Sequence, residues 1–394
     1  MNFVYDIINL EFVVVVSFFS VAYYLRSEPL KVFLLFGHIL VIFLLNDVLF
    51  PPTYMGDQLR YLDASRALRT FQSPAEGLFS TLGASSVFFA FFPFPFINSV
   101  QSIAMINFLL YLVAYAFLKR KRIATGSADF FFLLYPSLLL YSSVALREVI
   151  VLLLMLVVVY FFLMEKSLIV TLVLSIPLIF VKAQNFLILM LTFSIYAFFN
   201  VSGVKKRFFL LSTLLLLGYL LKGLVISRFS LPSSGFSILG VLENYRNYMY
   251  YEETGSYIEG YVAIQGWIDF FSKTIKGFFY MLFKPFPWEC ENILQVIQSI
   301  ENLVIVGLII YVNTRPVRLP AIRTRIRFLN LLLLVSMSVY GVVVFNFGSA
   351  ARYRFVFLVI YFVFFLYLLK SDRLILNQVK SAWSSEMDPH PVNA

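Results

Sequence analysis

Two adjacent charged residues, Arg147 and Glu148, interrupt a stretch that otherwise has the composition of a membrane-spanning helix, YSSVALREVIVLLLM. A charge at the centre of a bilayer costs at least about 2.5–3.5 kcal/mol, so such residues commonly mark a functional site. Lys182, Arg352 and Arg354 also adjoin apolar stretches. Because a guanidinium binds two phosphate oxygens at once and an ammonium attracts them as a point charge, these cations predict a phosphate-binding site. The alternative for Arg147 is a structural role, as a snorkelling side chain that caps a helix end or as the ion-pair partner of Glu148.

Carboxylates near these cations are candidates for proton transfer. In GDQLRYLDASRALR, the spacing of Asp57, Arg60 and Tyr61 places all three on one face of a helix. Asp57 either caps the start of that helix through its carboxylate or serves as a general base toward a hydroxyl group. Glu289 and Glu148 are rival candidates for the base.

Other candidate contacts for a substrate lie in two aromatic stretches. FKPFPWE contains Lys284 and Trp288, and ENYRNY contains Arg246 within a tyrosine-rich segment. Aromatic residues of this kind either anchor a protein at the membrane interface or offer flat apolar surfaces to sugar rings. Arg246 is then a candidate contact for a phosphate or a sugar.

The composition is that of a membrane protein. Of 394 residues, 61% are hydrophobic and only 13% are charged, whereas soluble domains carry roughly 25% charged residues. One cysteine and two histidines exclude a disulfide framework, a thiolate metal cluster and a multi-histidine site. A phosphate-binding P-loop, HExxH and GxSxG are all absent, which argues against ATP hydrolysis, zinc proteolysis and serine hydrolysis. No cofactor or metal is therefore expected, and the basic pI reports orientation rather than nucleic-acid binding.

Apolar runs predict an all-α, polytopic integral membrane protein with about eleven transmembrane helices. The predicted spans are 7–25, 32–50, 103–118, 128–146, 149–164, 167–181, 186–199, 208–227, 292–312, 328–347 and 355–370. Lys and Arg concentrate in alternate connections, as in KRKR at 119–122. The positive-inside rule then puts the N-terminus outside, the C-terminus inside and the candidate site residues at the outer ends of the spans.

The chain is expected to form a single transmembrane domain, 1–394. Two outer segments, 51–102 and the tyrosine-rich 228–291, and a cytoplasmic tail, 371–394, complete it. Within the outer segments, 78–99 and 267–283 are apolar but carry prolines or charges, so we expect amphipathic helices on the outer leaflet rather than spans. Tilted or broken spans are the alternative.

Three pieces of the sequence together resemble a known family: GDQLRY at 56–61, YPSLLLYSSVALRE at 135–148 and GSAARYR at 348–354. Their order and the predicted topology are similar to those of the bacterial EpsG/Wzy-type polysaccharide polymerases of capsule, O-antigen and exopolysaccharide synthesis. Glu148 stands where relatives often have Gln, and Lys182 where many have His. The resemblance implies a glycosyltransferase of the bacterial inner membrane with its active face outward.

Such an enzyme would polymerise glycan repeat units that are linked to undecaprenyl diphosphate, without a nucleotide donor. The resemblance implies that Arg147, Lys182, Arg352 and Arg354 bind the diphosphate, and that Asp57 or another outer carboxylate activates an acceptor hydroxyl. Membrane lipids and a chain-length regulator protein are expected partners, and nucleic acid is not. Two alternatives remain: a GT-C-type transferase that uses a polyprenyl-phosphate sugar, and a lipid-linked glycan flippase or exporter.

Overall fold

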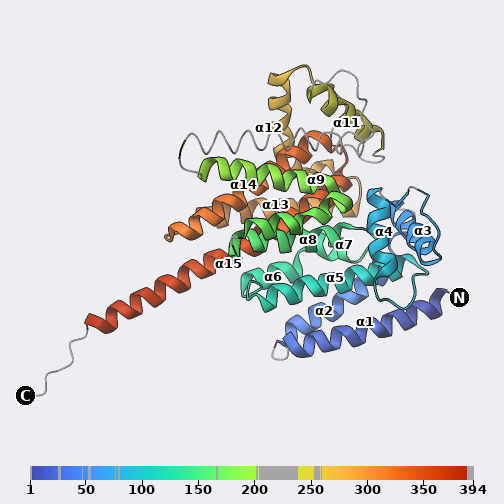
Figure 1. Cartoon of the computed structure of the whole chain (residues 1–394), viewed down its shortest axis with the longest axis horizontal. Coiled ribbons are helices and arrows are strands. Elements are labelled where there is room, and N and C mark those ends of the chain that lie inside the picture. Colours follow the sequence, from blue (N-terminus) through green and yellow to red (C-terminus); the bar gives the residue numbers. More distant parts are fainter. Residues whose placement is uncertain are drawn as a thin grey trace, which may run out of the picture.

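The computed structural model describes residues 2–24, 28–46, 48–51, 55–75, 77–78, 80–165, 167–200, 203, 238–252, 258 and 260–387. Every named secondary-structure element in these ranges is a helix, which confirms the all-α prediction. The long helices lie side by side, and the start of the first helix and the end of the last helix lie at opposite ends of the bundle (Figure 1). The predicted span 208–227 falls outside the described residues.

Six helices in the described ranges are long and apolar enough to cross a membrane. They are α5 (Val100–Arg120), α8 (Glu148–Tyr160) with its π-helical extension η2 (Phe161–Glu165), α9 (Leu168–Asn200), α13 (Ile293–Thr314), α14 (Pro320–Val343) and α15 (Phe347–Met387). The apolar helices α1 (Asn2–Tyr24) and α2 (Pro29–Leu45) lie beside them. The fold is therefore that of a polytopic membrane protein, while the count of eleven spans and the orientation stay predictions.

Helix α9 bends sharply at Lys182, whose backbone angles (φ −156°, ψ 83°) are not helical. Beyond the bend, Asn185 contacts Met155 of α8, and the Phe193 ring lies 4.5 Å from that of Phe162. Residue numbers rise together along both helices, so the second arm of α9 runs parallel to α8. Because only a short connection joins η2 to α9, the first arm must run in the opposite direction. The bend therefore lies between 167–181 and 186–199, where the sequence predicts a turn between two spans.

The predicted span 128–146 is broken in two, into α6 (Ser127–Leu134) and α7 (Pro136–Ser142). Glu301 of α13 accepts hydrogen bonds from the Ser137 backbone N–H (2.9 Å) and hydroxyl (2.6 Å) at the start of α7. A carboxylate at a helix N-terminus satisfies backbone donors that the helix leaves unpaired. This acid inside an apolar span therefore has a structural role as a cap.

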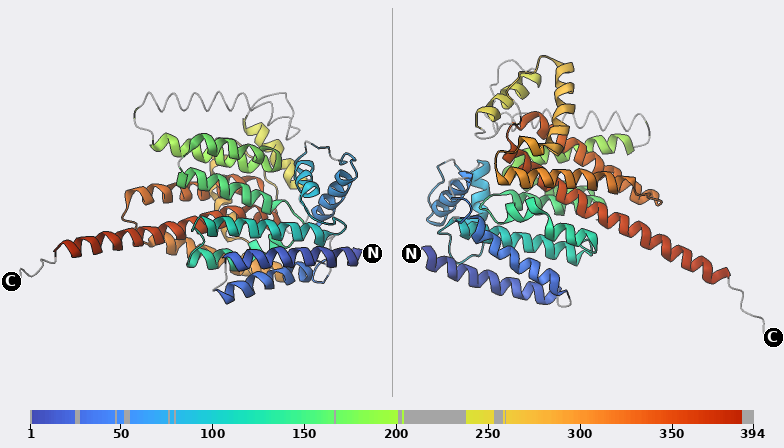
Figure 2. Two further views of the ribbon diagram at one scale, coloured as in Figure 1. Left: turned by 60° about the horizontal axis from the view of Figure 1, so that its bottom comes forward. Right: turned by 180° about the vertical axis from the view of Figure 1, so that it is seen from behind.

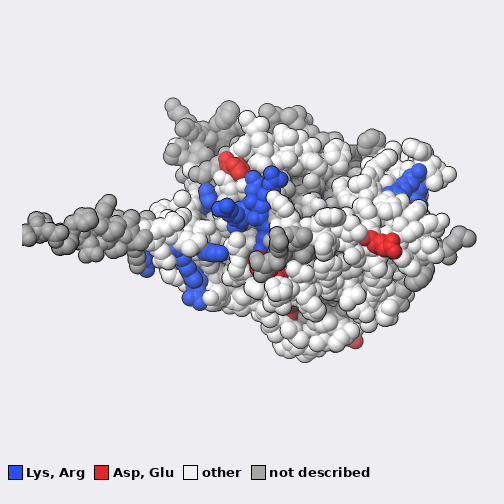
Figure 3. Space-filling model, turned by 90° about the horizontal axis from the view of Figure 1, so that it is seen from below, with Lys and Arg blue, Asp and Glu red and all other residues white. Residues whose placement is uncertain are grey.

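A buried ionic network ties together α2, α5 and α6. Asp129, fully buried, accepts from Lys31 (2.5 Å), Lys119 (2.7 Å) and the Tyr115 hydroxyl (2.7 Å). Lys31 thus lies in the first turn of α2, whereas the predicted span 32–50 leaves it in the preceding loop. On the face that Figure 3 draws, most of the basic side chains lie in the half from which α15 projects. The orientation in the membrane stays a prediction.

Two short helices, α3 (Asp57–Arg69) and α4 (Thr81–Phe91), pack against each other at the end of the bundle that carries the N-terminus. With 11 residues, α4 is too short to cross a core of about 30 Å, so it does not span as a helix. Arg66 and Arg69 donate to the carbonyl oxygens of Asn98 and Phe94 in the connection between α4 and α5, and Arg69 also donates to that of Ala90 within α4. Both arginines therefore hold this end of the fold together.

Helices α11 (Ile238–Glu252) and α12 (Trp267–Phe283) form a projection on one side of the bundle. Figures 1 and 2 show that α12 runs across the long helices rather than along them. It crosses α14 where Gly277 and Gly341 bring the two backbones into contact, since a Cβ on either residue would overlap the other. This arrangement agrees with the prediction that 267–283 does not span the membrane.

The variant Gly277→Ala should therefore lower the stability of the protein by about 2 kcal/mol, because the clash is with backbone that cannot turn aside. Thermal unfolding of the purified protein in detergent measures the effect. Gly307→Ala on α13 is the matched control, since open space surrounds Gly307 and alanine favours a helix. Equal melting temperatures for the two variants would contradict the close crossing.

Candidate anion-binding site

A charged cluster joins four segments that are far apart in the sequence. The Arg352 guanidinium donates from Nε to Glu148 Oε1 (2.6 Å) and from Nη1 to Asp57 Oδ2 (2.7 Å). The Lys182 ammonium lies 3.6 Å from the same Glu148 oxygen. Arg147 precedes Glu148, and its charge acts on Asp57 and Lys182 as well. Four of the predicted site residues thus gather around Glu148.

Each charged group of this cluster sits where a helix starts or bends. Asp57 is the first residue of α3, Glu148 is the first of α8, and Lys182 is at the bend of α9. Arg352 is in the second turn of α15, since that helix begins at Phe347. The Asp57 carboxylate binds Arg352 and makes no capping hydrogen bond, so the predicted role as a helix cap is not observed.

The α7–α8 loop, which carries Arg147, is held by side chains that the sequence analysis did not single out. Asn107 of α5 donates to two carbonyl oxygens of this loop, at 2.7 and 2.6 Å. Gln58 accepts from the Ala145 N–H at 2.8 Å, and Asn46 donates to the Ser143 carbonyl oxygen at 2.9 Å. The sequence signal that could have found Asn107 is a polar amide inside the predicted span 103–118. The structure buries this amide fully.

The cluster has a deep end and an open end. Glu148 and Lys182 are 0% and 2% exposed, whereas the Asp57 side chain is 37% exposed and that of Arg352 is 17%. At the deep end, the Lys182 ammonium lies 3.8 Å from the centre of the Tyr353 ring, an attractive cation–π contact. A ligand arriving from the surface would therefore reach Asp57 and Arg352 first.

Unpaired polar atoms mark the interior of the cluster. Arg147 Nε and Glu148 Oε2 are buried and have no hydrogen-bond partner. Buried polar atoms are nearly always paired in folded proteins, so an unpaired guanidinium nitrogen beside further cations suits an oxygen-rich ligand. Burial lowers the pKa of Arg147, but Tyr61 and Glu148 raise it above its ordinary value, so the guanidinium stays charged.

The pKa of Asp57 reflects its neighbours. Burial raises it, but the charges of Arg352, Arg60 and Arg147 outweigh burial and hold the pKa of this carboxyl below its ordinary value. The Arg60 side chain is 56% exposed and lies 3.4 Å from Asp57 Oδ1. Burial also raises the pKa of Tyr61 to about 12, so this phenol stays neutral. Asp57 is thus ionised, and its pairing with Arg352 makes it a weak base in this state.

Arg354 does not join the cluster, contrary to the sequence expectation. The predicted span 355–370 leaves Arg352 and Arg354 before its first helical residue, where both could reach one ligand. Both instead lie within α15, where side chains two residues apart point about 200° apart around the helix axis. Arg354 is 1% exposed and donates to the carbonyl oxygen of Met281 (2.9 Å) and to Asn302. It joins α12, α13 and α15 and has no direct contact with the cluster.

Lys284, Glu289 and Trp288 form a separate group between α12 and α13. Lys284 donates to Glu289 (2.7 Å) and to a backbone carbonyl oxygen, and Glu289 in turn accepts from the Phe286 N–H (3.0 Å). Trp288 is 79% exposed and stacks on the Phe286 ring at 5.0 Å. These contacts fold the connection locally, so neither Glu289 nor Lys284 is placed to act at the cluster.

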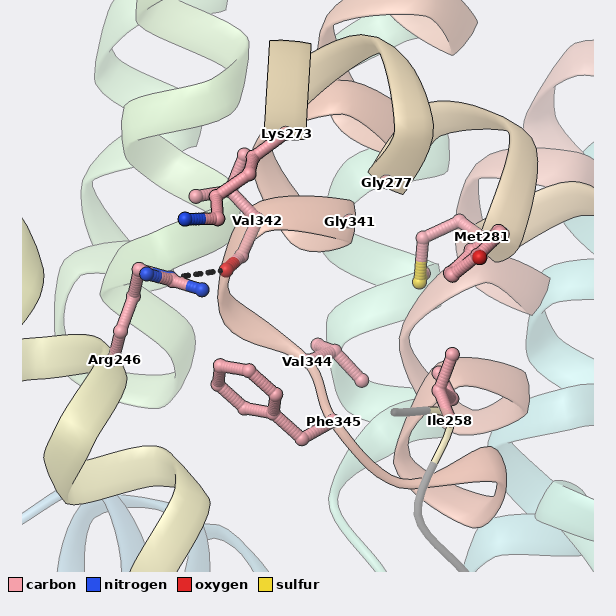
Figure 4. A pocket seen from close by; sticks show the side chains of 10 residues that line it. Arg246, Ile258, Lys273, Gly277, Met281, Gly341, Val342, Val344 and Phe345 are labelled. Atoms are coloured by element: carbon pink, nitrogen blue, oxygen red, sulfur yellow. Dashed lines mark hydrogen bonds between the residues drawn. The ribbon is translucent and has the colours of Figure 1, made fainter. Parts of the chain in front are cut away.

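Arg246 is also occupied elsewhere. It donates to the Val342 carbonyl oxygen (2.9 Å) and to Glu243 (2.9 Å), and it faces a cavity between α11, α12 and α14 together with Lys273 (Figure 4). That cavity holds about 20 Å³, which is room for about one water molecule. A sugar ring does not fit there, so the predicted sugar contact through Arg246 has no support in this structure.

The fold and the cluster together define a helical membrane protein with cations and carboxylates gathered at one end of its bundle. Comparison with known proteins adds no relative: no family model, no curated protein and no solved structure matches the chain.

Proposed function

We propose that this protein polymerises lipid-linked glycan repeat units, as the Wzy-type polymerases do, with the cluster around Glu148 as the site for the diphosphate of the carrier lipid. The observation that carries the proposal is that Lys182 and Arg352 converge from distant segments on Glu148 and that Arg352 also binds Asp57. The charge of Arg147 acts on both carboxylates as well. The proposed location is the bacterial inner membrane, with this end of the bundle outward.

The chemistry is a transfer between two lipid-linked glycans. The bond between the anomeric carbon of the growing glycan and its phosphate oxygen breaks, and the lipid diphosphate leaves with the electron pair. An acceptor sugar hydroxyl forms the new bond to that carbon and loses its proton to a carboxylate, for which Asp57 is the candidate. No nucleotide and no oxidant enter this balance.

The cations supply what this reaction needs most, which is stabilisation of the negative charge that develops on the leaving diphosphate. Donors that are already in place in a dry site stabilise such charge strongly, because they need no reorganisation. The Arg147 guanidinium, with its unpaired Nε, is one such donor. Glu148 is fully buried between Arg352 and Lys182, so its role is to hold these two cations rather than to move a proton.

Single replacement of Arg147 or Arg352 by alanine should abolish long-chain polysaccharide in the producing bacterium. Losing one charge-stabilising donor commonly costs about 10²–10³ in rate. A gel of the surface polysaccharide measures the chain-length ladder, with protein abundance checked by immunoblot. Arg373→Ala, an exposed position farther along α15, is the matched control and should leave the ladder intact.

The same experiment separates the alternatives. Unchanged ladders in both cluster variants at normal abundance would refute the proposal. Loss of one sugar decoration with an intact ladder would indicate the transferase that uses a polyprenyl-phosphate sugar. Lipid-linked repeat units trapped on the inner leaflet would indicate an exporter.

A further inference from the structure

We propose that Arg352 holds Asp57 in an inactive ion pair, and that a phosphate-bearing ligand frees the carboxylate by taking over this guanidinium. The inference rests on the proposed function and adds an order of events to it: the donor diphosphate binds first, and only then is Asp57 available to an acceptor hydroxyl. Asp57 is thereby a base that the substrate itself unmasks.

The geometry shows which of the two carboxylates on Arg352 can be exchanged. Glu148 accepts the hydrogen bond from Arg352 Nε, is 0% exposed and also contacts Lys182. No ligand can therefore replace Glu148 without entering the deep end of the cluster. Asp57 accepts the hydrogen bond from Arg352 Nη1, is 37% exposed and lies at the open end of the cluster. A phosphate oxygen that reaches Arg352 from the surface therefore competes with Asp57 and leaves Glu148 in place.

Charge favours this exchange. A phosphate that occupies the space next to Arg352 also comes within the field of Arg147, whose Nε has no partner, and of the exposed Arg60. A carboxylate offers Arg352 one unit of charge, whereas a diphosphate offers more charge and more acceptor oxygens. The attraction between Arg352 and a diphosphate is therefore stronger than its attraction to Asp57.

The exchange changes the basicity of Asp57. The groups that face this carboxylate are Arg60 and Tyr61 from its own helix, Arg147 and Glu148 at the start of α8, and Arg352 from α15. The three arginines hold the pKa of Asp57 below its ordinary value in the unliganded protein. When a ligand neutralises them and adds its own negative charge, the pKa of Asp57 must rise, and a higher pKa makes a better base near neutral pH.

The test is the binding of inorganic pyrophosphate to the purified full-length protein in nanodiscs. Titration calorimetry at constant ionic strength measures the affinity. Asp57→Asn removes the competitor for Arg352, so it should bind pyrophosphate about 3- to 10-fold more tightly than the wild type. Asp63→Asn, at an exposed position one to two turns farther along α3, is the matched control and should bind as the wild type does. Equal or weaker binding by Asp57→Asn would overturn the inference.

A measurement on the wild-type protein covers the case in which Asp57→Asn does not fold. Sulfate, which does not change its own charge in this range, should bind with uptake of a fraction of a proton at about pH 4.5, close to the ordinary pKa of aspartate. Calorimetry in two buffers of different ionisation enthalpy measures that uptake. Sulfate binding without proton uptake would also overturn the inference.

The two proposals fail in different ways. If Arg352→Ala abolishes both pyrophosphate binding and the polysaccharide ladder while Asp57→Asn leaves the affinity unchanged, the masked base is wrong and the polymerase stands. If neither the wild type nor Asp57→Asn binds pyrophosphate at millimolar concentration, the cluster is not a diphosphate site, and both proposals fall.

Discussion

Replacing Glu148 with alanine is expected to destabilise the protein by about 3–5 kcal/mol, the range found when one partner of a buried ion pair is removed. Arg352 Nε and the Lys182 ammonium both contact Glu148 Oε1, and Lys182 is almost fully buried. Without this carboxylate, three cations face one another with only Asp57 to offset them. Unfolding of the purified protein by titration with a denaturing detergent measures the loss.

A double variant shows whether uncompensated charge is the cause. Glu148→Ala combined with Arg352→Met removes the carboxylate and one cation, so it should recover part of the stability that Glu148→Ala alone loses. The conservative Glu148→Gln, which keeps the shape but not the charge, should resemble Glu148→Ala more than the wild type. If Glu148→Gln were as stable as the wild type, the attraction between Glu148 and its cations would contribute little to the fold.

Arg354→Met is the second large effect, and we expect a loss of stability of about 2–4 kcal/mol with no specific loss of anion binding. Arg354 is buried where α12 and α13 meet α15, and it satisfies the Met281 carbonyl oxygen and the Asn302 amide oxygen. The long apolar side chain of methionine fills the space but leaves those acceptors unpaired. Thermal unfolding measures the stability and calorimetry measures pyrophosphate binding, both on the same preparation.

Arg352→Met is the matched control, since it lies two positions away in the same helix. It should lose pyrophosphate binding and retain more of the stability, because Arg352 is partly exposed and Glu148 keeps Lys182 as a partner when Arg352 is removed. If Arg354→Met stays stable and loses pyrophosphate binding, the separation of the two arginines around α15 is incorrect.

Charge and apolarity alone predicted the helical membrane fold class and several of the residues that gather in the candidate site. An ionisable residue beside an apolar run is costly, so Arg147, Glu148, Lys182 and Arg352 stood out one by one, and the structure brings them together. Asp57 stood out because its spacing with Arg60 and Tyr61 places all three on one face of a predicted helix, and α3 does begin at Asp57.

Other parts of the site depend on tertiary contacts that a single sequence does not contain. Whether Arg354 reaches the cluster depends on where α15 begins, and helix ends are the least predictable feature of a chain. Lys284 and Glu289 look like a substrate site in the sequence, yet they neutralise each other. Asn107 and Gln58 act on loop backbone whose position only the packed bundle determines.

Helix α15 carries Arg352 near its start and continues without interruption for 41 residues. At 1.5 Å per residue this rod is about 60 Å long, far longer than one crossing requires. A stiff rod transmits an axial displacement or a rotation along its whole length. If the helix backbone at Arg352 shifts when that residue changes partner, the shift would reach the opposite end of α15, where a spectroscopic label could register occupancy of a site that the label never touches.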